Sequence, residues 1–248
     1  MKLSSLAKLG SVLMLLKSKK NLRNFINLAA ETRGFNSPFK ISYSQGCEDL
    51  SIKSIISSGE RGSYIDIGAH DPSRFSNTRL LYELGWRGIN IDADEELLPR
   101  FLTERPDDVN ICAAVGSEKE YLLNVFDEKL VSTVDSKKVE FEVSIGRRKV
   151  SERTVKGVTL RSLLDKYYPQ DRVSILLIDI EGSDFDALNS IDFNTLENWR
   201  FPKYLVLEAF PPVAEALSAP AVKLALSKGY KPLLVLPFST ILAAPDVD

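Results

Sequence analysis

The chain has few of the residues that build metal centres and disulfide frameworks. Its 248 residues include two cysteines, one histidine, two methionines and two tryptophans. Cys47 and Cys112 lie 65 positions apart, so together with His70 they form no tetrahedral zinc set at a familiar spacing. We therefore expect reduced thiols in a cytoplasmic protein. We assign no metal ligand, and whether the protein requires a metal stays open.

Long apolar runs and several catalytic signatures are missing too. No apolar stretch approaches the ~20 residues that span a bilayer. None of the thirteen glycines precedes a lysine, so there is no Walker-type phosphate loop. The G-x-S-x-G turn of many hydrolases is absent, as is the Tyr-x-x-x-Lys spacing of many short-chain reductases. Nucleic-acid binding is not predicted, because the basic residues gather in an apolar-patterned segment without an aromatic platform.

Charge is unevenly distributed along the chain. Residues 1–40 hold eight Lys or Arg and one acid, a net charge of +7, which leaves −9 for residues 41–248. Apolar residues recur at helical spacing over about 21–34, and a second helix is expected at about 3–16. We predict a basic helical extension over 1–40 and a main domain over 41–248. The extension either packs on the main domain or a partner, or contacts the inner face of a membrane peripherally.

From residue 44 onward, short β-rich runs alternate with helical segments. Strands are expected at 64–69, 87–93, 109–115, 174–180 and 203–210, followed by two strand-like pieces around Pro237. Helices are expected at 76–85, about 95–103, 159–168 and before Gly229, and residues 117–158 look less regular. Strands separated by helices predict an α/β fold with a mostly parallel, doubly wound sheet.

Acidic residues follow nearly every predicted strand. These residues are Asp66, Asp92, Asp94, Asp179, Glu181 and Glu208, and Gly68 also ends the first strand. Ligands of parallel sheets bind beyond the carboxyl ends of the strands. A single acid at such a position is usually a helix cap or a solvated turn residue. Their coincidence on one edge predicts a binding site.

The ligand of this edge is expected to be cationic. The first strand continues into GAHDP, which lacks the G-x-G-x-x-G pattern that brings backbone close to a pyrophosphate. The next helix cap, at Ser76 or Asn77, comes about eight residues later, and Asp71 in the loop would repel phosphate. S-adenosylmethionine suits the edge better, because it carries a sulfonium, an ammonium and ribose hydroxyls but no phosphate.

Six motifs in order resemble FkbM-type S-adenosylmethionine-dependent methyltransferases. They are YSQGCEDL (43–50), YIDIGAHDP (64–72), SNTRLLYELGWRGINIDAD (76–94), AAVGS (113–117), VTLRSLLDKY (158–167) and LLIDIEGSDFDAL (176–188). The resemblance covers roughly 43–236. It implies a seven-stranded, Rossmann-like methyltransferase sheet with an antiparallel last strand. It also implies O-methylation, often of sugar hydroxyls in glycans, lipopolysaccharide or glycosylated natural products.

The resemblance assigns cofactor-binding roles to residues of this chain. Asp66 and Gly68, with Ala69 and His70, would shape the loop around the methionine part of the cofactor, and Asp92 would accept hydrogen bonds from the ribose hydroxyls. Ala113 and Ala114 would flank the adenine, unless they are plain sheet core. Gln45, Glu48 and Asp49 would form a lid or anchor the methionine amine, although capping of the next helix is an equally simple role. Asp179 lies at the same strand edge.

Methyl transfer to a hydroxyl requires that the acceptor oxygen is positioned and that a group of the protein accepts its proton. Methyl transfer is an in-line displacement, and a hydroxyl acceptor must lose a proton, for which the candidates are His70, Asp179 and Glu181. Along a continuing strand Asp179 and Glu181 would not both face the acceptor. We expect one of them to be the base and His70 to position the loop.

Two other functions are alternatives to methyl transfer. They are a non-catalytic S-adenosylmethionine-binding module that serves a partner protein, and a nicotinamide-dependent oxidoreductase acting on a nucleotide sugar. The identity of the acceptor and the oligomeric state are not predicted.

Overall fold

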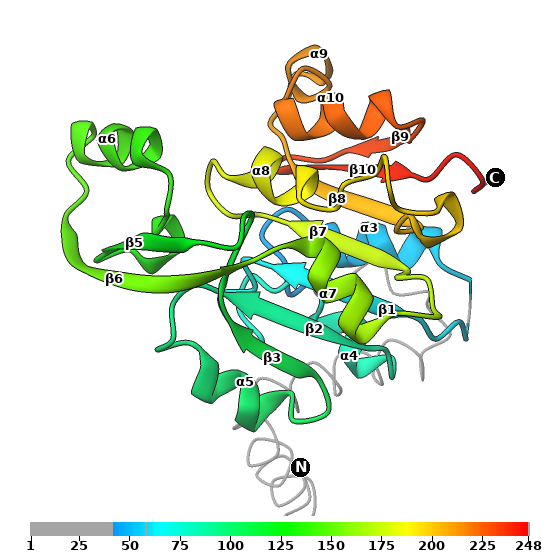
Figure 1. Cartoon of the computed structure of the whole chain (residues 1–248), viewed down its shortest axis with the longest axis horizontal. Helices are drawn as coiled ribbons and strands as arrows, with labels where there is room; N and C mark the ends of the chain where they lie inside the picture. Colours follow the sequence, from blue (N-terminus) through cyan, green and yellow to red (C-terminus); the bar gives the residue numbers. More distant parts are fainter. Residues whose placement is uncertain (1–41, 58, 248) are drawn as a thin grey trace, which may run out of the picture. The chain divides into compact units, whose positions relative to one another are not determined.

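The computed structural model describes residues 42–57 and 59–247 (Figure 1). The helices predicted within residues 1–40 therefore lie outside the described part of the chain. Within that part, no helix is long and apolar enough to cross a membrane.

The main sheet has seven strands in the order β3-β2-β1-β7-β8-β10-β9. The first five of these pair in parallel, and β10 runs antiparallel to both of its neighbours. The predicted α/β fold, with its seven strands and its antiparallel strand near the C-terminus, is confirmed. The bounds are β1 Ser63–Ile67, β2 Arg87–Asp92, β3 Val109–Cys112, β7 Ile175–Ile178, β8 Tyr204–Glu208, β9 Lys231–Val235 and β10 Ser239–Ala243.

Helices cover both faces of this sheet. On one face Ile52 of α3 (Glu48–Ile55) and Leu81 of α4 (Arg79–Glu83) pack with Tyr64, Leu177 and Val206. The other face carries the larger core. It packs α7 (Leu160–Tyr167), α8 (Asp184–Asn189) and α10 (Pro220–Ser227) against the isoleucines and leucines of the central strands. Two further helices are α5 (Leu98–Glu104) beside β3 and the short α9 (Val213–Ala216).

Local signals set some of the helix ends. Thr159 caps α7, because its side chain accepts a hydrogen bond from the backbone of Ser162 at 3.0 Å. Ser76 likewise accepts one from Arg79 at 3.1 Å, but the helix begins only at Arg79, three residues later than predicted. Gly85, with φ 90, ends this segment as expected.

Two sequence-based expectations need correction. Residues 109–115 are not one strand: β3 ends at Cys112, and β4 (Ala114–Val115) joins a second sheet after a break at Ala113. The stretch 117–158 is also more regular than expected, since it forms β5 (Glu120–Phe126), α6 (Ser136–Ser144) and β6 (Lys149–Val158). The first half of β6 is mostly exposed and polar, so it lacks the alternation that signals a half-buried strand.

The insertion projects beyond the edge of the main sheet on the left of Figure 1. Its strands pair in the order β4-β6-β5, and α6 lies between β5 and β6 in the chain. Lys129 and Arg153 of this insertion bind Asp94, which follows β2, at 3.2 and 2.6 Å. These ion pairs tie the insertion to the edge where the predicted acids lie.

Candidate active site

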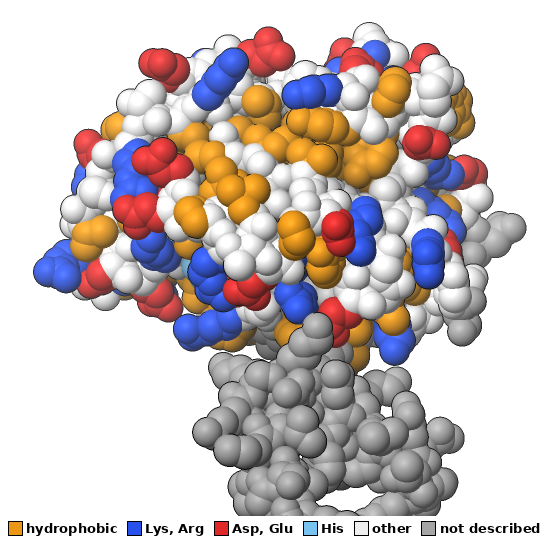
Figure 2. Space-filling model, turned by 90° about the horizontal axis from the view of Figure 1, so that it is seen from below, with side chains coloured by type: hydrophobic (Ala, Val, Ile, Leu, Met, Phe, Trp, Pro, Cys, Tyr) orange, Lys and Arg blue, Asp and Glu red, His pale blue; other side chains and the backbone are white. Residues whose placement is uncertain are grey.

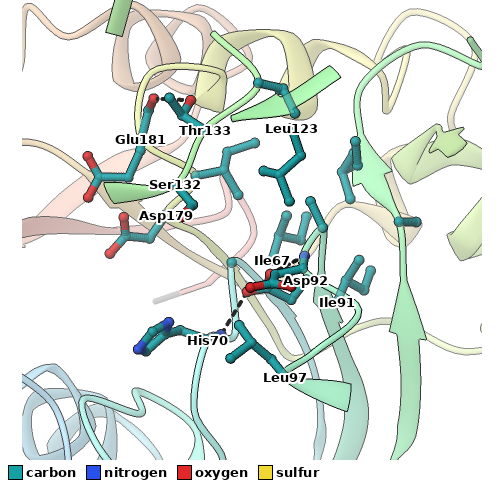
Figure 3. Close-up of a pocket in the computed structure, with 18 of the residues that line it drawn as sticks. Ile67, His70, Ile91, Asp92, Leu97, Leu123, Ser132, Thr133, Asp179 and Glu181 are labelled. Atoms are coloured by element: carbon teal, nitrogen blue, oxygen red, sulfur yellow. Dashed lines mark hydrogen bonds between the residues drawn. The ribbon is translucent and has the colours of Figure 1, made fainter. Parts of the chain in front are cut away.

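A cavity and an adjoining groove lie where the carboxyl ends of the central strands face the insertion. The cavity measures about 70 Å³ and is mostly apolar (Figure 3). The groove is larger, at about 360 Å³, and is lined by acids and aromatic rings. Every predicted site residue except Asp49 lines the cavity or the groove. The cavity is lined by Gly68, His70, Asp92, Ala113, Asp179 and Glu181. The groove is lined by Gln45, Glu48, Asp66, Gly68, Ala69, His70, Asp179 and Glu181.

Gly68 sits where two loops approach most closely. Its φ of 80 is in the left-handed region, and a Cβ there would lie 1.8 Å from the carbonyl oxygen of Asp179. Any side chain would push the loops after β1 and β7 apart. The glycine therefore lets these two loops form one continuous wall of the site.

Asp92 links the loop after β1 to the end of β2. Its two carboxylate oxygens accept hydrogen bonds from the backbone nitrogens of His70 and Asp94, at 2.9 and 2.8 Å. Burial raises the pKa of Asp92 to about 6. Each carboxylate oxygen has a further lone pair, so Asp92 can still accept hydrogen bonds from a ligand in the cavity.

His70 occupies the bend of the loop after β1, with a φ of 50. Its ring lies on the same side of the cavity as the carboxylates of Asp179 and Glu181 (Figure 3). Burial lowers the pKa of His70, although Asp71 opposes the effect, so the imidazole is neutral at pH 7. Asp71 itself lines neither the cavity nor the groove: it accepts backbone hydrogen bonds from Ser73 and Arg74 and pairs with Arg100.

The two acids in the first turn of α3, Glu48 and Asp49, have different surroundings. Asp49 is fully buried and accepts hydrogen bonds from the backbone of Tyr43 and from the hydroxyls of Ser42 and Ser44, so it fixes the preceding loop. Glu48 lines the groove instead. Asp66 also reaches the groove, and its carboxylate accepts a 2.5 Å hydrogen bond from the Thr78 hydroxyl.

Asp179 and Glu181 both face the groove, which corrects the expectation that only one of them would. Strand β7 ends at Ile178, and the chain then turns sharply at Glu181 and Gly182, with φ values of 54 and 107. The alternation of a continuing strand therefore does not apply. The loop is held by Asp184, whose carboxylate accepts from the backbones of Ile180 and Gly182.

Water reaches Asp179 from the open groove, yet protein atoms surround its carboxylate closely. This partial loss of water, together with repulsion from Asp184 and Glu181, raises the pKa of Asp179. Burial, together with repulsion from neighbouring acids of which Asp179 has the largest effect, also raises the pKa of Glu208 at the end of β8. Glu208 was seen in the sequence as a strand-end acid, but no site role was assigned to it.

Sequence reasoning missed the contribution of the insertion. Ser132, Thr133 and Val134 line the cavity, and the Thr133 hydroxyl donates to the carbonyl oxygen of Glu181 at 2.9 Å. Lys138 of α6 reaches Glu181 at 2.6 Å. Four phenylalanine side chains also line the groove: Phe75, Phe141, Phe210 and Phe238. No local signal marked these residues, because they come together only in three dimensions.

Charges of both signs are interspersed, with hydrophobic side chains between them, over the face of the described residues seen in Figure 2. This face therefore differs from the site itself, where acids predominate. Two basic residues, Lys138 and Arg147, line the groove beside seven acids, which are Glu48, Asp66, Glu128, Glu142, Asp179, Glu181 and Glu208. A cationic ligand is favoured by this imbalance.

Several solved structures are similar to the chain at low identity. A TehB-like SAM-dependent methyltransferase from Corynebacterium glutamicum is 10% identical, with 88% of this chain and 96% of that chain covered and a TM-score of 0.41. Fibrillarin from Aeropyrum pernix with natively bound S-adenosyl-L-methionine is 10% identical, with 79% and 72% covered and a TM-score of 0.42. An O-methyltransferase from Bacillus cereus in complex with SAH is 10% identical, with 94% and 90% covered and a TM-score of 0.39. No curated protein matches the chain.

A family model, the methyltransferase FkbM domain, matches residues 66–221. The match covers more than half of the chain and runs from the acid that precedes the Gly68 turn into α10. It includes Asp92, Ala113, Asp179 and Glu181 and the whole insertion. The chain belongs to the FkbM methyltransferase family, which confirms the family, the methyltransferase activity and the S-adenosylmethionine cofactor predicted from its motifs.

Proposed function

We propose that the chain transfers a methyl group from S-adenosylmethionine to a hydroxyl of a sugar, glycan or glycosylated metabolite. The observation that carries this proposal is the set of residues shared by the cavity and the groove. Gly68, His70, Leu130, Asp179 and Glu181 line both. A donor in the cavity and an acceptor in the groove would therefore meet at these five residues.

The cavity suits the donor in the chemistry of its lining. Asp92 is placed to accept hydrogen bonds from ribose hydroxyls, and Ala113 and Ala114 with Ile91 and Leu123 offer an apolar surface for an adenine ring. Gly68 allows the methionine part to approach the backbone. When bound, S-adenosylmethionine supplies an electrophilic methyl group and leaves as S-adenosylhomocysteine.

The groove suits a polyhydroxylated acceptor. Carboxylates accept hydrogen bonds from hydroxyl groups, while aromatic rings such as Phe210 and Phe238 contact the C–H faces of a sugar ring. The hydroxyl proton would pass to Asp179 or Glu181 as the oxygen–methyl bond forms, and a base of this kind contributes ~10² to 10⁴ in rate. His70, whose backbone is bound by Asp92, would position the loop between donor and acceptor.

Mass spectrometry of cell-surface glycans tests the proposed acceptor class. Cells that express the wild-type gene should carry a methylated sugar that is missing when the gene is deleted. Complementation with Asp179→Asn should leave that sugar unmethylated, whereas Asp171→Asn, an exposed change before the start of β7 at the opposite end of that strand from Asp179, should restore it. Unchanged glycans in all strains, with the methyl group found on another class of molecule, would contradict the sugar assignment.

A further inference from the structure

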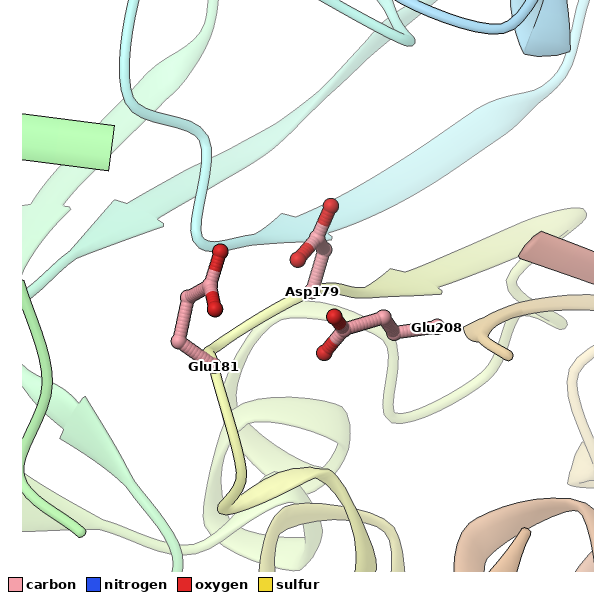
Figure 4. A group of neighbouring side chains, drawn as sticks. All are labelled: Asp179, Glu181 and Glu208. Carbon is pink, nitrogen blue, oxygen red and sulfur yellow. The ribbon is translucent and has the colours of Figure 1, made fainter. Parts of the chain in front are cut away.

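Three carboxylates converge at the ends of β7 and β8. One oxygen each from Asp179, Glu181 and Glu208 lies within 4.8 Å of the other two, and the side chains face a common space (Figure 4). Oxygen ligands on opposite sides of Mg²⁺ lie roughly 4.2 Å apart, and those of Ca²⁺ roughly 4.8 Å. The three oxygens therefore already fit the span of one coordination sphere.

A second observation comes from two buried groups beside this trio. Glu48 is 2% exposed and Ser239 is 6% exposed, yet Oε1 of Glu48 and Oγ of Ser239 have no hydrogen-bond partner among the described residues. Buried polar atoms almost always have a partner. Both residues line a small cavity of about 20 Å³ together with Asp179 and Glu208, which is room enough for one water or ion.

The sheet explains why these groups point to the same place. Ser239 of β10 pairs directly with Glu208 of β8, so the two side chains lie on one face. That face is the one covered by α3, which carries Glu48 in its first turn. Glu48 and Ser239 thus lie beside the trio on the α3 side of the sheet, and Glu48 also lines the groove.

The local charge balance is strongly negative. Glu48, Asp179, Glu181 and Glu208 face Lys138, which binds Glu181 at 2.6 Å and also Glu142 at 3.3 Å. Burial and mutual repulsion already raise the pKa of Asp179 and of Glu208. A set of oxygen-only ligands with excess negative charge favours a hard divalent cation over a transition metal that prefers nitrogen or sulfur.

We propose that Asp179, Glu181 and Glu208 bind a divalent cation of the Mg²⁺ class at the base of the acceptor groove, with Glu48 and Ser239 completing the site from the buried side. The role of this site in the reaction rests on the proposed function. A cation here would contact adjacent hydroxyl oxygens of an acceptor and lower their pKa. Each carboxylate has two oxygens, so Asp179 or Glu181 can bind the cation with one and accept a proton with the other.

Titration of Mn²⁺ into the chelator-treated full chain tests the site without cofactor or acceptor. Electron paramagnetic resonance of free Mn²⁺ should show one bound ion per chain, displaced by excess Mg²⁺. Glu208→Gln should weaken binding by at least ~10-fold, since loss of even a supporting group costs 10- to 100-fold in metal affinity. Asp179→Asn, a change at an exposed position, should do the same, whereas Glu215→Gln in exposed α9 should bind Mn²⁺ as the wild type does.

Binding of S-adenosylhomocysteine to the same samples separates this proposal from the proposed function. The Glu208→Gln protein should still bind S-adenosylhomocysteine, which shows that it is folded; if it does not fold, Asp179→Asn carries the test. Wild-type protein that binds S-adenosylhomocysteine but no Mn²⁺ up to ~1 mM, the weak end of protein cation sites, would overturn the cation site and leave the methyltransferase intact. Equal Mn²⁺ affinity in wild type, Glu208→Gln and Asp179→Asn would overturn it too.

Discussion

At the scale of single residues, the site depends on a few side chains whose surroundings change their chemistry. The sequence predicted Asp92, Gly68, Asp179 and Glu181 because each follows a strand, and the structure places all four at the same edge. It could not predict that Asp179 and Glu181 converge, since this follows from the positive φ of Glu181. It also could not assign Glu208 to the site, because its partners come from β7 and β10.

We expect Asp92→Ala to lose ~10- to 150-fold in S-adenosylhomocysteine affinity. The change removes charge-assisted hydrogen bonds to the ribose, which are worth ~1.5 to 3 kcal/mol. Calorimetry on folded protein measures the effect, and Asp171→Ala at an exposed position is the matched control. An unchanged dissociation constant in Asp92→Ala would show that the ribose lies elsewhere.

The raised pKa of Glu208 predicts how the stability of the protein depends on pH. Its folded-state pKa is raised by burial and by Asp179, so its contribution to stability is fully present below the pKa of the unfolded chain and is lost as pH rises through the folded pKa. In EDTA, the free energy of unfolding of the wild type should therefore fall between about pH 5 and pH 8.5. Glu208→Gln should be more stable than wild type by ~1 to 3 kcal/mol at the higher pH and by less at the lower one.

Thermal melts at the two pH values measure this difference, with Glu215→Gln as the control that should follow the wild type. A shift of ~1 kcal/mol corresponds to ~2–4 °C in a chain of this size. A wild-type stability that rises with pH over this range, or a Glu208→Gln protein that is less stable at pH 8.5, would contradict the raised pKa.

At the scale of elements, most strands of the main sheet and several of its helices were predictable, and the insertion was not. Thr159 caps its helix as expected, and Gly85 and Gly229 end their segments with positive φ. These signals are local in sequence. The insertion strand β6 pairs through its backbone with β5, and only its last residues bury side chains, so its sequence carries little periodic signal.

One buried arginine holds the loop between β1 and α4. Arg105 is fully buried and donates to the Pro72 carbonyl at 3.1 and 2.9 Å, and to Ser76, Thr78 and Asn90 at 2.5 to 3.0 Å. The loop that carries His70 therefore depends on a residue more than thirty positions away. Nothing near Arg105 in the sequence indicates this role.

We predict that Arg105→Met destabilises the protein by ~3 to 5 kcal/mol, because removing one member of a buried polar network leaves the other members unsatisfied. Chemical denaturation measures the change. Arg148→Met, at a side chain that is 78% exposed, should stay within ~0.5 kcal/mol of wild type. Equal stability of the two variants would show that the network does not hold the loop.

At the scale of the whole molecule, every site residue lies after residue 41. Removal of residues 1–40 should therefore leave S-adenosylhomocysteine affinity unchanged. If the basic segment contacts a membrane, the full chain should bind vesicles only when anionic lipid is present, and less at high salt, at about 1 kcal/mol per basic residue near the surface. Loss of folding in the truncated protein would support the alternative in which its helices pack on the main domain.

The edge of this sheet is expected to bind a methyl donor and not a dinucleotide. The helix after β1 begins at Arg79, eleven residues beyond Gly68, so no helix N-terminus follows that turn directly to receive a pyrophosphate.

Calorimetric titration of the full chain with S-adenosylhomocysteine and, separately, with NAD⁺ distinguishes the two ligands. We predict one S-adenosylhomocysteine bound per chain and no heat of binding with NAD⁺. Binding of NAD⁺ at micromolar concentrations, with none of S-adenosylhomocysteine, would contradict the account.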